Sequence, residues 1–224
     1  MSVKVLASVR DAEEAKVALA AGAHVIDLKE PAAGALGAVS IEVVRDVVTL
    51  ISGKALVSAT IGDLPLVPDH IYEACKAWAT TGVDYIKIGI FPGDLPGTLK
   101  ALAPLIKDGA KIIAVVFADG HIMWQQVLTH VAEAGFAGIM LDTGNKSNGG
   151  LLDNLPAAVC CAFVTAAHEH GLMCGLAGSL KLEDIPVLAS FAPDYLGFRG
   201  ALCDDGRSGK LSAAKLKAVI SALQ

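Results

Sequence analysis

The chain has 224 residues, of which 54% are hydrophobic and 18% are charged, and its formal net charge is -5 at pH 7. This length is enough for one large domain with a well-buried core. The acidic balance and the lack of any long Lys or Arg run argue against nucleic acid or an anionic membrane surface as the main partner, although a small anion could bind in a local basic pocket.

The five cysteines and the first residues of the chain indicate a cellular compartment. The cysteines form no CxxC pair and have no histidines at metal-ligand spacing, a pattern that fits a reducing environment. The N-terminal sequence does not resemble a secretory signal, and no apolar run approaches membrane-spanning length. We therefore expect a cytoplasmic protein without a metal site.

Short runs rich in Val, Ile and Leu alternate eight times with Ala-rich stretches at helical spacing, which is typical of βα units. The expected strands are Val3 to Ser8, His24 to Lys29, Ala55 to Ile61, Tyr85 to Ile90, Lys111 to Asp119, Gly138 to Thr143, Met173 to Ser179 and Tyr195 to Gly200. The expected helices are Asp11 to Ala21, Ile41 to Ile51, Asp69 to Thr80, Gly97 to Ile106, Trp124 to Ala134, Pro156 to His170, Leu182 to Ser190 and Ser212 to Leu223.

Eight such units predict a single (β/α)8 TIM barrel that occupies residues 1–224. An open doubly wound sheet is the alternative. It is disfavoured because no GxGxxG turn follows the first strand and because the units continue evenly to the C-terminus. In a barrel, the long loops that follow the strands lie at the C-terminal face, where barrel enzymes build their active sites.

Charged residues fall on one face of the even-numbered strands. Side chains alternate between the two faces of a strand, so each charge can be assigned to the face opposite the aliphatic residues. This assignment predicts that Asp27, Lys29, Lys87, Asp142 and Arg199 point into the barrel, near its mouth. These residues could form purely structural ion pairs, but buried pairs seldom improve on apolar packing.

Such a cluster should change the protonation of a lysine. Two ammonium groups about 6 Å apart at an effective dielectric of about 20 repel each other by roughly 3 kcal/mol, or about two pKa units. Burial acts in the same direction, whereas Asp27 and Asp142 oppose it. We predict one lysine with an appreciable neutral fraction near pH 7, able to form a Schiff base with a carbonyl while the carboxylates move protons.

Two later segments are typical of an anion site. The sequence "CGLAGSLKLED" (174–184) ends a strand with Gly178 and Ser179, and "GFRGALC" (197–203) follows the next strand with Arg199 and Gly200. Glycines let backbone N–H groups approach an anion, and the loops after strands seven and eight of a barrel frequently bind phosphate. We expect these four residues to bind a substrate phosphate, although glycine turns are common at strand ends.

Two further segments leave alternatives open. Asp119 and His121, beside the end of the fifth strand, could transfer protons or simply cap a helix. Arg207 and Lys210, in "DDGRSGKLS", could close over a phosphate or lie in a solvated loop.

Several motifs resemble the (5-formylfuran-3-yl)methyl phosphate synthase family. They are "VIDLKEPAAGALGA" (25–38), "DYIKIGI" (84–90), "MLDTGNKSNGGLLD" (140–153), "GLAGSL" and "GFRGALC". The resemblance covers nearly the whole chain and implies a (β/α)8 barrel. The implied reaction condenses two molecules of glyceraldehyde 3-phosphate, with loss of phosphate and water, into the furan precursor of methanofuran or its analogue.

The resemblance also implies roles for individual residues. Lys29 would form the Schiff base with Asp27 beside it, while Lys87, Asp142 and Lys146 match positions that assist proton transfer and isomerisation. It implies a phosphorylated small molecule as substrate and no cofactor, because an iminium can replace a metal in stabilising an enolate. We also expect a homo-oligomer.

Three alternatives remain. A decarboxylase of the orotidine-phosphate or ketogulonate-phosphate type would carry DxKxxD, but Ala32 occupies the third position of that motif. A class I aldolase acting on a sugar phosphate would use similar lysine chemistry. A non-enzymatic barrel that binds a phosphate metabolite would not need a nucleophilic Lys29.

Overall fold

Eight parallel strands close into a barrel in chain order, and β1 pairs with both β2 and β8. This computed structural model describes residues 3–120 and 123–224, apart from the side chain of Lys146. The strands are β1 (Lys4–Val9), β2 (Val25–Leu28), β3 (Leu56–Thr60), β4 (Tyr85–Gly89), β5 (Ile112–Phe117), β6 (Gly138–Asp142), β7 (Met173–Leu176) and β8 (Tyr195–Phe198). The predicted (β/α)8 barrel is confirmed.

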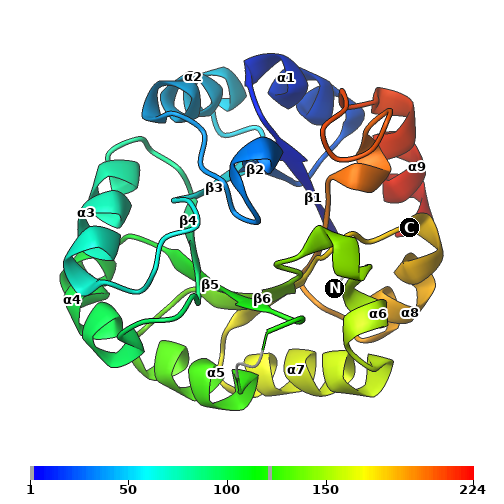
Figure 1. Ribbon diagram of the computed structural model, residues 1–224. Helices are drawn as coiled ribbons and strands as arrows, with labels where there is room; N and C mark the ends of the chain where they lie inside the picture. The colour runs from blue at the N-terminus through cyan, green and yellow to red at the C-terminus, as the bar shows by residue number, and fades with distance from the viewer. Residues whose placement is uncertain (1–2, 121–122) are drawn as a thin grey trace.

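Helices surround the barrel, and shorter helical turns lie over the strands within this ring (Figure 1). The α-helices are α1 (Ala12–Ala21), α2 (Ile41–Ile51), α3 (Pro68–Ala79), α4 (Leu95–Lys107), α5 (Trp124–Glu133), α6 (Leu151–Asn154), α7 (Ala157–Glu169), α8 (Ile185–Ser190) and α9 (Ala213–Ala222). The 3-10 turns are η1 (Pro31–Ala33), η2 (Lys146–Asn148), η3 (Leu182–Asp184) and η4 (Gly200–Leu202).

Local chemistry explains where several helices begin. The side chain of Asp11 accepts a hydrogen bond from the Glu14 N–H at the start of α1, and Ser40 accepts one from the Val43 N–H at the start of α2. The expected helix from Leu182 to Ser190 begins as η3 and continues as α8, which carries a proline in its first turn.

The alternation along the strands produces two hydrophobic cores. Ile26 and Leu28 belong to the core between the sheet and the helices, together with residues of α2 such as Val44. Leu6, Val115 and Met140 belong to a second core inside the barrel. The faces assigned from the sequence therefore correspond to the outside and the inside of the barrel.

Every strand except β1 ends one to three residues earlier than expected, and three of these ends change where site residues lie at the mouth of the barrel. Strand β2 ends at Leu28, β7 at Leu176 and β8 at Phe198, so Lys29, Ser179 and Arg199 follow the sheet instead of belonging to it. After β7 the chain turns through a left-handed conformation at Gly178 (φ 110°) and Ser179 (φ 48°). These residues therefore belong to the loops that form the mouth.

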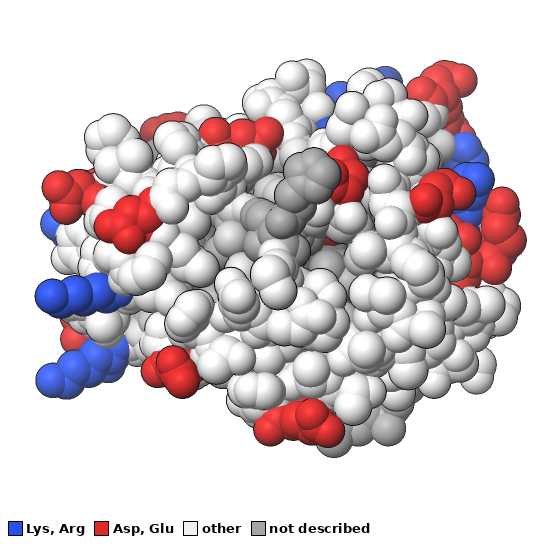
Figure 2. Space-filling model, turned by 60° about the horizontal axis from the view of Figure 1, so that its bottom comes forward, with Lys and Arg blue, Asp and Glu red and all other residues white. Residues whose placement is uncertain are grey.

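The outer surface shows no large basic area in the view of Figure 2, where uncharged residues predominate and acidic side chains are scattered. Within residues 3–120 and 123–224, no helix combines the length and the apolar character needed to cross a bilayer.

Candidate active site

Asp27 lies at the centre of a hydrogen-bond cluster inside the barrel and is fully buried. Lys87 Nζ lies 2.7 Å from Asp27 Oδ1, to which Ser58 Oγ also donates at 2.6 Å. Ser8 Oγ donates to Asp27 Oδ2 at 3.0 Å. Strand register explains this arrangement, because Ser8 and Ser58 are the partners of Asp27 on the two neighbouring strands. Asp27 is thus held in one orientation beside Lys87.

A second lysine pairs with the carboxylate at the end of β6. Lys29 Nζ lies 3.4 Å from Asp142 Oδ2, and both side chains are buried. The other oxygen of Asp142 accepts a hydrogen bond from the Thr143 N–H at 2.7 Å. Lys29 therefore has a carboxylate beside it that can exchange a proton with it.

The protonation of Lys87 is perturbed. Burial lowers the pKa of Lys87 and the positive charge of Lys29 lowers it further, whereas Asp27 and, more weakly, Asp142 oppose this shift. The net shift is downward, because removing an ammonium from water is costly. Of the two lysines in the lumen, Lys87 is thus the one whose pKa is lowered, and a neutral fraction near pH 7 stays a prediction.

A cavity of about 420 Å³ opens above these residues at the mouth of the barrel. This volume lies within the range of small-molecule sites. The residues predicted for the site that line it are Asp27, Lys29, Lys87, Asp142, Gly178, Ser179, Arg199 and Gly200. Lys146 begins η2, just beyond Asp142, but its side chain lies outside the described part of the chain.

The loops after β7 and β8 contribute Gly178, Ser179, Gly200 and Ala201 to the lining of this cavity. In the described part of the chain, no protein acceptor is found for the N–H groups of Gly178, Ser179, Gly200 and Ala201. A Cβ atom at position 178 would lie 2.9 Å from Thr143 Cγ2 and 3.0 Å from the Thr143 nitrogen, so only glycine fits there. These N–H groups are suited to an anion such as phosphate.

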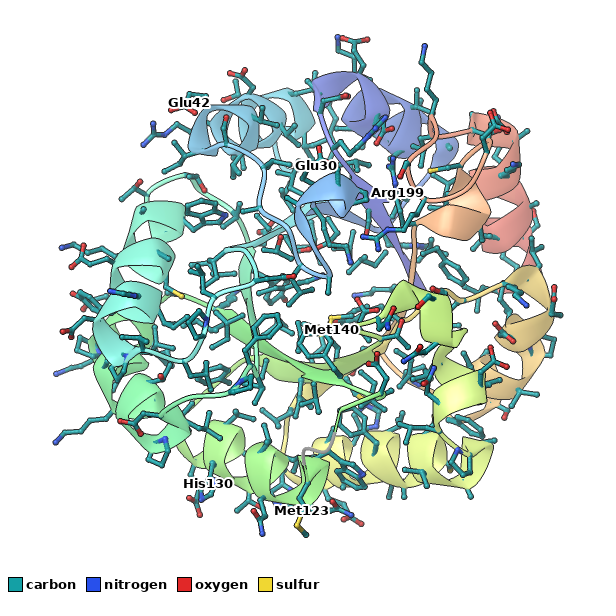
Figure 3. All side chains as sticks on the ribbon, in the orientation of Figure 1. Glu30, Glu42, Met123, His130, Met140 and Arg199 are labelled. Carbon is teal, nitrogen blue, oxygen red and sulfur yellow. The ribbon has the colours of Figure 1, made fainter. Side chains whose placement is uncertain are left out.

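Arg199 is bound to the protein through all five of its N–H donors. Nη1 and Nη2 both donate to the Glu14 carboxylate. The remaining donors reach backbone oxygens of Ser8, Arg207 and Gly209 at 2.8 to 3.1 Å. Figure 3 shows Arg199 at the edge of the barrel opening, whereas Met140 lies near its centre. Its guanidinium has no N–H left for a substrate in this arrangement, so Arg199 holds the loop and the N–H groups beside it remain available to an anion.

Glu14 is the partner of Arg199 and comes from helix α1. It also accepts hydrogen bonds from the Arg10 N–H at 3.0 Å and from Arg10 Nη2 at 3.1 Å. Burial alone would raise the pKa of Glu14, but the hydrogen bonds and charge of Arg199, together with Arg10, outweigh it and hold this pKa below its ordinary value.

The four residues whose roles the sequence left open are Asp119, His121, Arg207 and Lys210. The carboxylate of Asp119 accepts hydrogen bonds from the N–H groups of Gly144 (2.7 Å) and Asn145 (2.6 Å), so it braces the loop that follows Asp142. His121 lies outside the described residues. Arg207 lines the cavity, whereas Lys210 is exposed and is not part of its lining.

Sequence reasoning did not identify Ser8, Ser58 or Glu14. The strand alternation that placed Asp27 inside the barrel also places Ser8 and Ser58 there, so that signal was present. Glu14 gave no such signal, because an acidic residue in the first turn of a helix is usually exposed.

Metal and thiol chemistry find little support among the described residues. No three His, Cys, Asp or Glu side chains in residues 3–120 and 123–224 gather as a metal would require. Burial raises the pKa of Cys75 to about 12 and that of Cys160 to about 11, so both remain protonated thiols near neutral pH.

The sequence of the chain matches one protein family. The sequence model described as 4-HFC-P synthase matches residues 5–220. A Methylorubrum extorquens protein assigned to (5-formylfuran-3-yl)methyl phosphate synthase is 42% identical over 222 residues, which cover 99% of this chain and 92% of that protein. The synthase of that name from Methanosarcina acetivorans is 36% identical, with 92% of each chain covered.

Solved structures share the fold at low sequence identity. The 3-hexulose-6-phosphate synthase of Salmonella typhimurium superposes with a TM-score of 0.70 at 13% identity, covering 99% of this chain and 100% of that one. Phosphoribosyl anthranilate isomerase of Thermus thermophilus superposes with a TM-score of 0.69 at 17% identity, covering 99% and 98%.

Proposed function

The chain belongs to the 4-HFC-P synthase family of enzymes, and from this premise we propose that it condenses two molecules of glyceraldehyde 3-phosphate into (5-formylfuran-3-yl)methyl phosphate. The observation that carries the proposal is the pairing of Lys29 with Asp142 and of Lys87 with Asp27 in one lumen beneath two loops with available N–H groups. We propose that the product serves the biosynthesis of methanofuran or its analogue.

The chemistry begins at Lys29. Its neutral amine attacks the carbonyl carbon of one triose phosphate, water leaves, and a protonated Schiff base forms. This iminium acidifies the neighbouring C–H bond, and loss of that proton gives an enamine. The enamine expels its phosphate by cleavage of the C–O bond, and the carbon that carried the phosphate becomes the end of an enol. This carbon attacks the carbonyl carbon of the second triose, isomerised to its ketone form, and makes the new carbon–carbon bond. A hydroxyl of the second triose closes the ring, two waters leave, and hydrolysis of the imine releases the furan, so that one phosphate and two waters are lost in total.

The neighbouring groups supply the proton transfers. Asp142, beside Lys29, can take a proton from its ammonium and return it during imine formation. Lys87, whose pKa is lowered, can serve as a base for the C–H proton. Asp27 holds Lys87 in place and stabilises the ammonium that results. The N–H groups of Gly178, Ser179, Gly200 and Ala201 can bind one substrate phosphate.

Trapping of the Schiff base tests this proposal. The protein is incubated with glyceraldehyde 3-phosphate and borohydride, and the adduct is mapped by mass spectrometry. We expect an adduct on Lys29, none in Lys29→Ala, and a furan absorbance in the unreduced reaction. Lys111→Ala is a suitable control, because Lys111 is exposed before β5.

The outcomes separate the alternatives. The absence of an adduct at Lys29, with the protein folded, would refute the Schiff-base mechanism. An adduct without furan absorbance would favour a class I aldolase, since that enzyme shares the imine but not the ring closure.

A further inference from the structure

Arg207 crosses the mouth of the barrel from the loop after β8 to the loop after β2. Its Nη2 donates to the backbone oxygens of Pro31 at 2.9 Å and Gly34 at 3.0 Å. Pro31 lies only two residues beyond Lys29, and Arg207 itself lines the cavity. The guanidinium is therefore held near the part of the cavity that contains the proposed nucleophile.

The remaining donors of Arg207 are available to a ligand. Both protein acceptors are bound by Nη2, which leaves the Nε hydrogen and the two Nη1 hydrogens. Within residues 3–120 and 123–224, no acceptor is found for these three hydrogens and no carboxylate lies within ion-pair distance of Arg207. Arg199 and Arg10, by contrast, share the carboxylate of Glu14. Arg207 thus keeps its charge and three donors at the cavity.

Both ends of this bridge are fixed. On one side, Arg199 donates to the backbone oxygens of Arg207 and Gly209, which ties that segment to the barrel. On the other side, the carboxylate of Asp63 accepts hydrogen bonds from the N–H groups of Ala35 (2.8 Å) and Leu36 (2.6 Å). The orientation of the guanidinium is therefore set before any ligand binds, which reduces the entropy lost on binding.

The position of Arg207 differs from that of the N–H groups proposed to bind phosphate. Those groups lie after β7 and β8, whereas the guanidinium is anchored over the loop after β2. The guanidinium therefore lies on the β2 side of β1, whereas those N–H groups lie on the β8 side. The proposed reaction brings two triose phosphates, and therefore two phosphate groups, into one cavity.

We propose that Arg207 binds the phosphate group of the second triose, while the N–H groups after β7 and β8 bind that of the first. This inference rests on the proposed function, because only a reaction between two triose phosphates needs two phosphate subsites. A guanidinium can bind a phosphate through two parallel hydrogen bonds, and Arg207 has donors to form them.

Calorimetric titration with glycerol 3-phosphate tests the proposal, because this triose phosphate analogue has no carbonyl and cannot form an imine. We expect the wild-type protein to bind two molecules per chain and Arg207→Gln to bind one. Lys210→Gln, which removes an exposed cation three residues away, should still bind two. Arg207→Lys keeps the charge but loses the paired hydrogen bonds, so its second site should weaken about 10-fold.

Catalysis provides an independent measurement. In Arg207→Gln the substrate concentration for half-maximal furan formation should rise by about 10- to 100-fold, while borohydride trapping at Lys29 stays as in the wild type. A wild-type chain that binds one glycerol 3-phosphate, or an Arg207→Gln chain that binds two with unchanged affinity or loses both sites, would overturn the inference. A failure of the proposed function gives a different result: no Lys29 adduct or furan in the wild type, whatever the binding stoichiometry.

Discussion

Two buried clusters of charge lie close together at the mouth of the barrel and differ in what their cations can do. In the lumen, Lys29 meets Asp142 at 3.4 Å and Lys87 meets Asp27 at 2.7 Å. At the rim, Arg199 donates all five of its N–H groups to the protein, two of them to Glu14. An ammonium can lose its proton within the range that proteins reach, whereas a guanidinium cannot. The first arrangement suits proton transfer and the second suits fixing a loop.

Replacing Lys87 should produce the largest effect. Lys87→Gln removes the base while keeping a polar group of similar length near Asp27, so we expect turnover to fall by about 10²- to 10⁴-fold. Lys111→Gln, on the exposed side of the neighbouring unit, should behave as the wild type. The measurement is the initial rate of furan formation. Wild-type turnover in a folded Lys87→Gln protein would show that Lys87 has only a structural role.

Replacing Glu14 should mainly affect stability. Glu14→Gln leaves the buried guanidinium of Arg199 without its carboxylate, so we expect the free energy of unfolding to decrease by about 3 to 5 kcal/mol. Glu13→Gln, one residue earlier on α1, changes an exposed side chain paired with Lys16 and should cost less than about 1 kcal/mol. Denaturation in urea measures both. Equal losses in the two variants would contradict a structural role for the rim cluster.

Lowering the pH should reduce the contribution of the Glu14–Arg199 pair to stability. The folded protein holds the pKa of Glu14 below its ordinary value of 4.5, so between these two values the unfolded chain binds more protons than the folded one. The contribution of Glu14 to stability is complete above pH 4.5 and is lost as the pH falls through the folded pKa. The difference in unfolding free energy between wild type and Glu14→Gln should therefore shrink below pH 4.5, and a constant difference would contradict this assignment.

The smallest effect should come from the serines around Asp27. Ser58→Ala removes the 2.6 Å hydrogen bond to Asp27 Oδ1, and we expect a loss of about 1 kcal/mol in the free energy of unfolding. Ser221→Ala, at an exposed position of α9, should lose less than about 0.5 kcal/mol. Thermal or urea unfolding compares them. If Ser58→Ala and Ser221→Ala lost the same free energy of unfolding, the hydrogen bond from Ser58 to Asp27 would not contribute to stability.

The sequence predicted most of the fold because the patterns in a barrel are local. Apolar runs and helical spacing located all eight strands, and alternation placed Asp27 and Lys87 inside the barrel. The errors lie at the strand ends. Lys29, Ser179 and Arg199 continue the apparent strand pattern, but the backbone turns away there to form the mouth, and that turn depends on contacts with neighbouring loops.

The partners of charged residues were harder to predict. Arg199 looked like a phosphate ligand because it stands between glycines after the last strand. Its partner Glu14 lies 185 residues earlier in the chain, and only the closure of β1 against β8 brings the two together. A similar separation explains why the partners of Arg207 were not predicted. Its acceptors, the backbone oxygens of Pro31 and Gly34, lie on the far side of β1.

The tight contact at Gly178 limits which amino acids this position can accept. Both its left-handed backbone and the nearness of the Thr143 nitrogen exclude a side chain, and no change of the Thr143 side chain would relieve the second restriction. In a library randomised at positions 178 and 179 and selected for furan formation, position 178 should return glycine alone. Position 179, with its φ of 48°, should also admit asparagine and glycine.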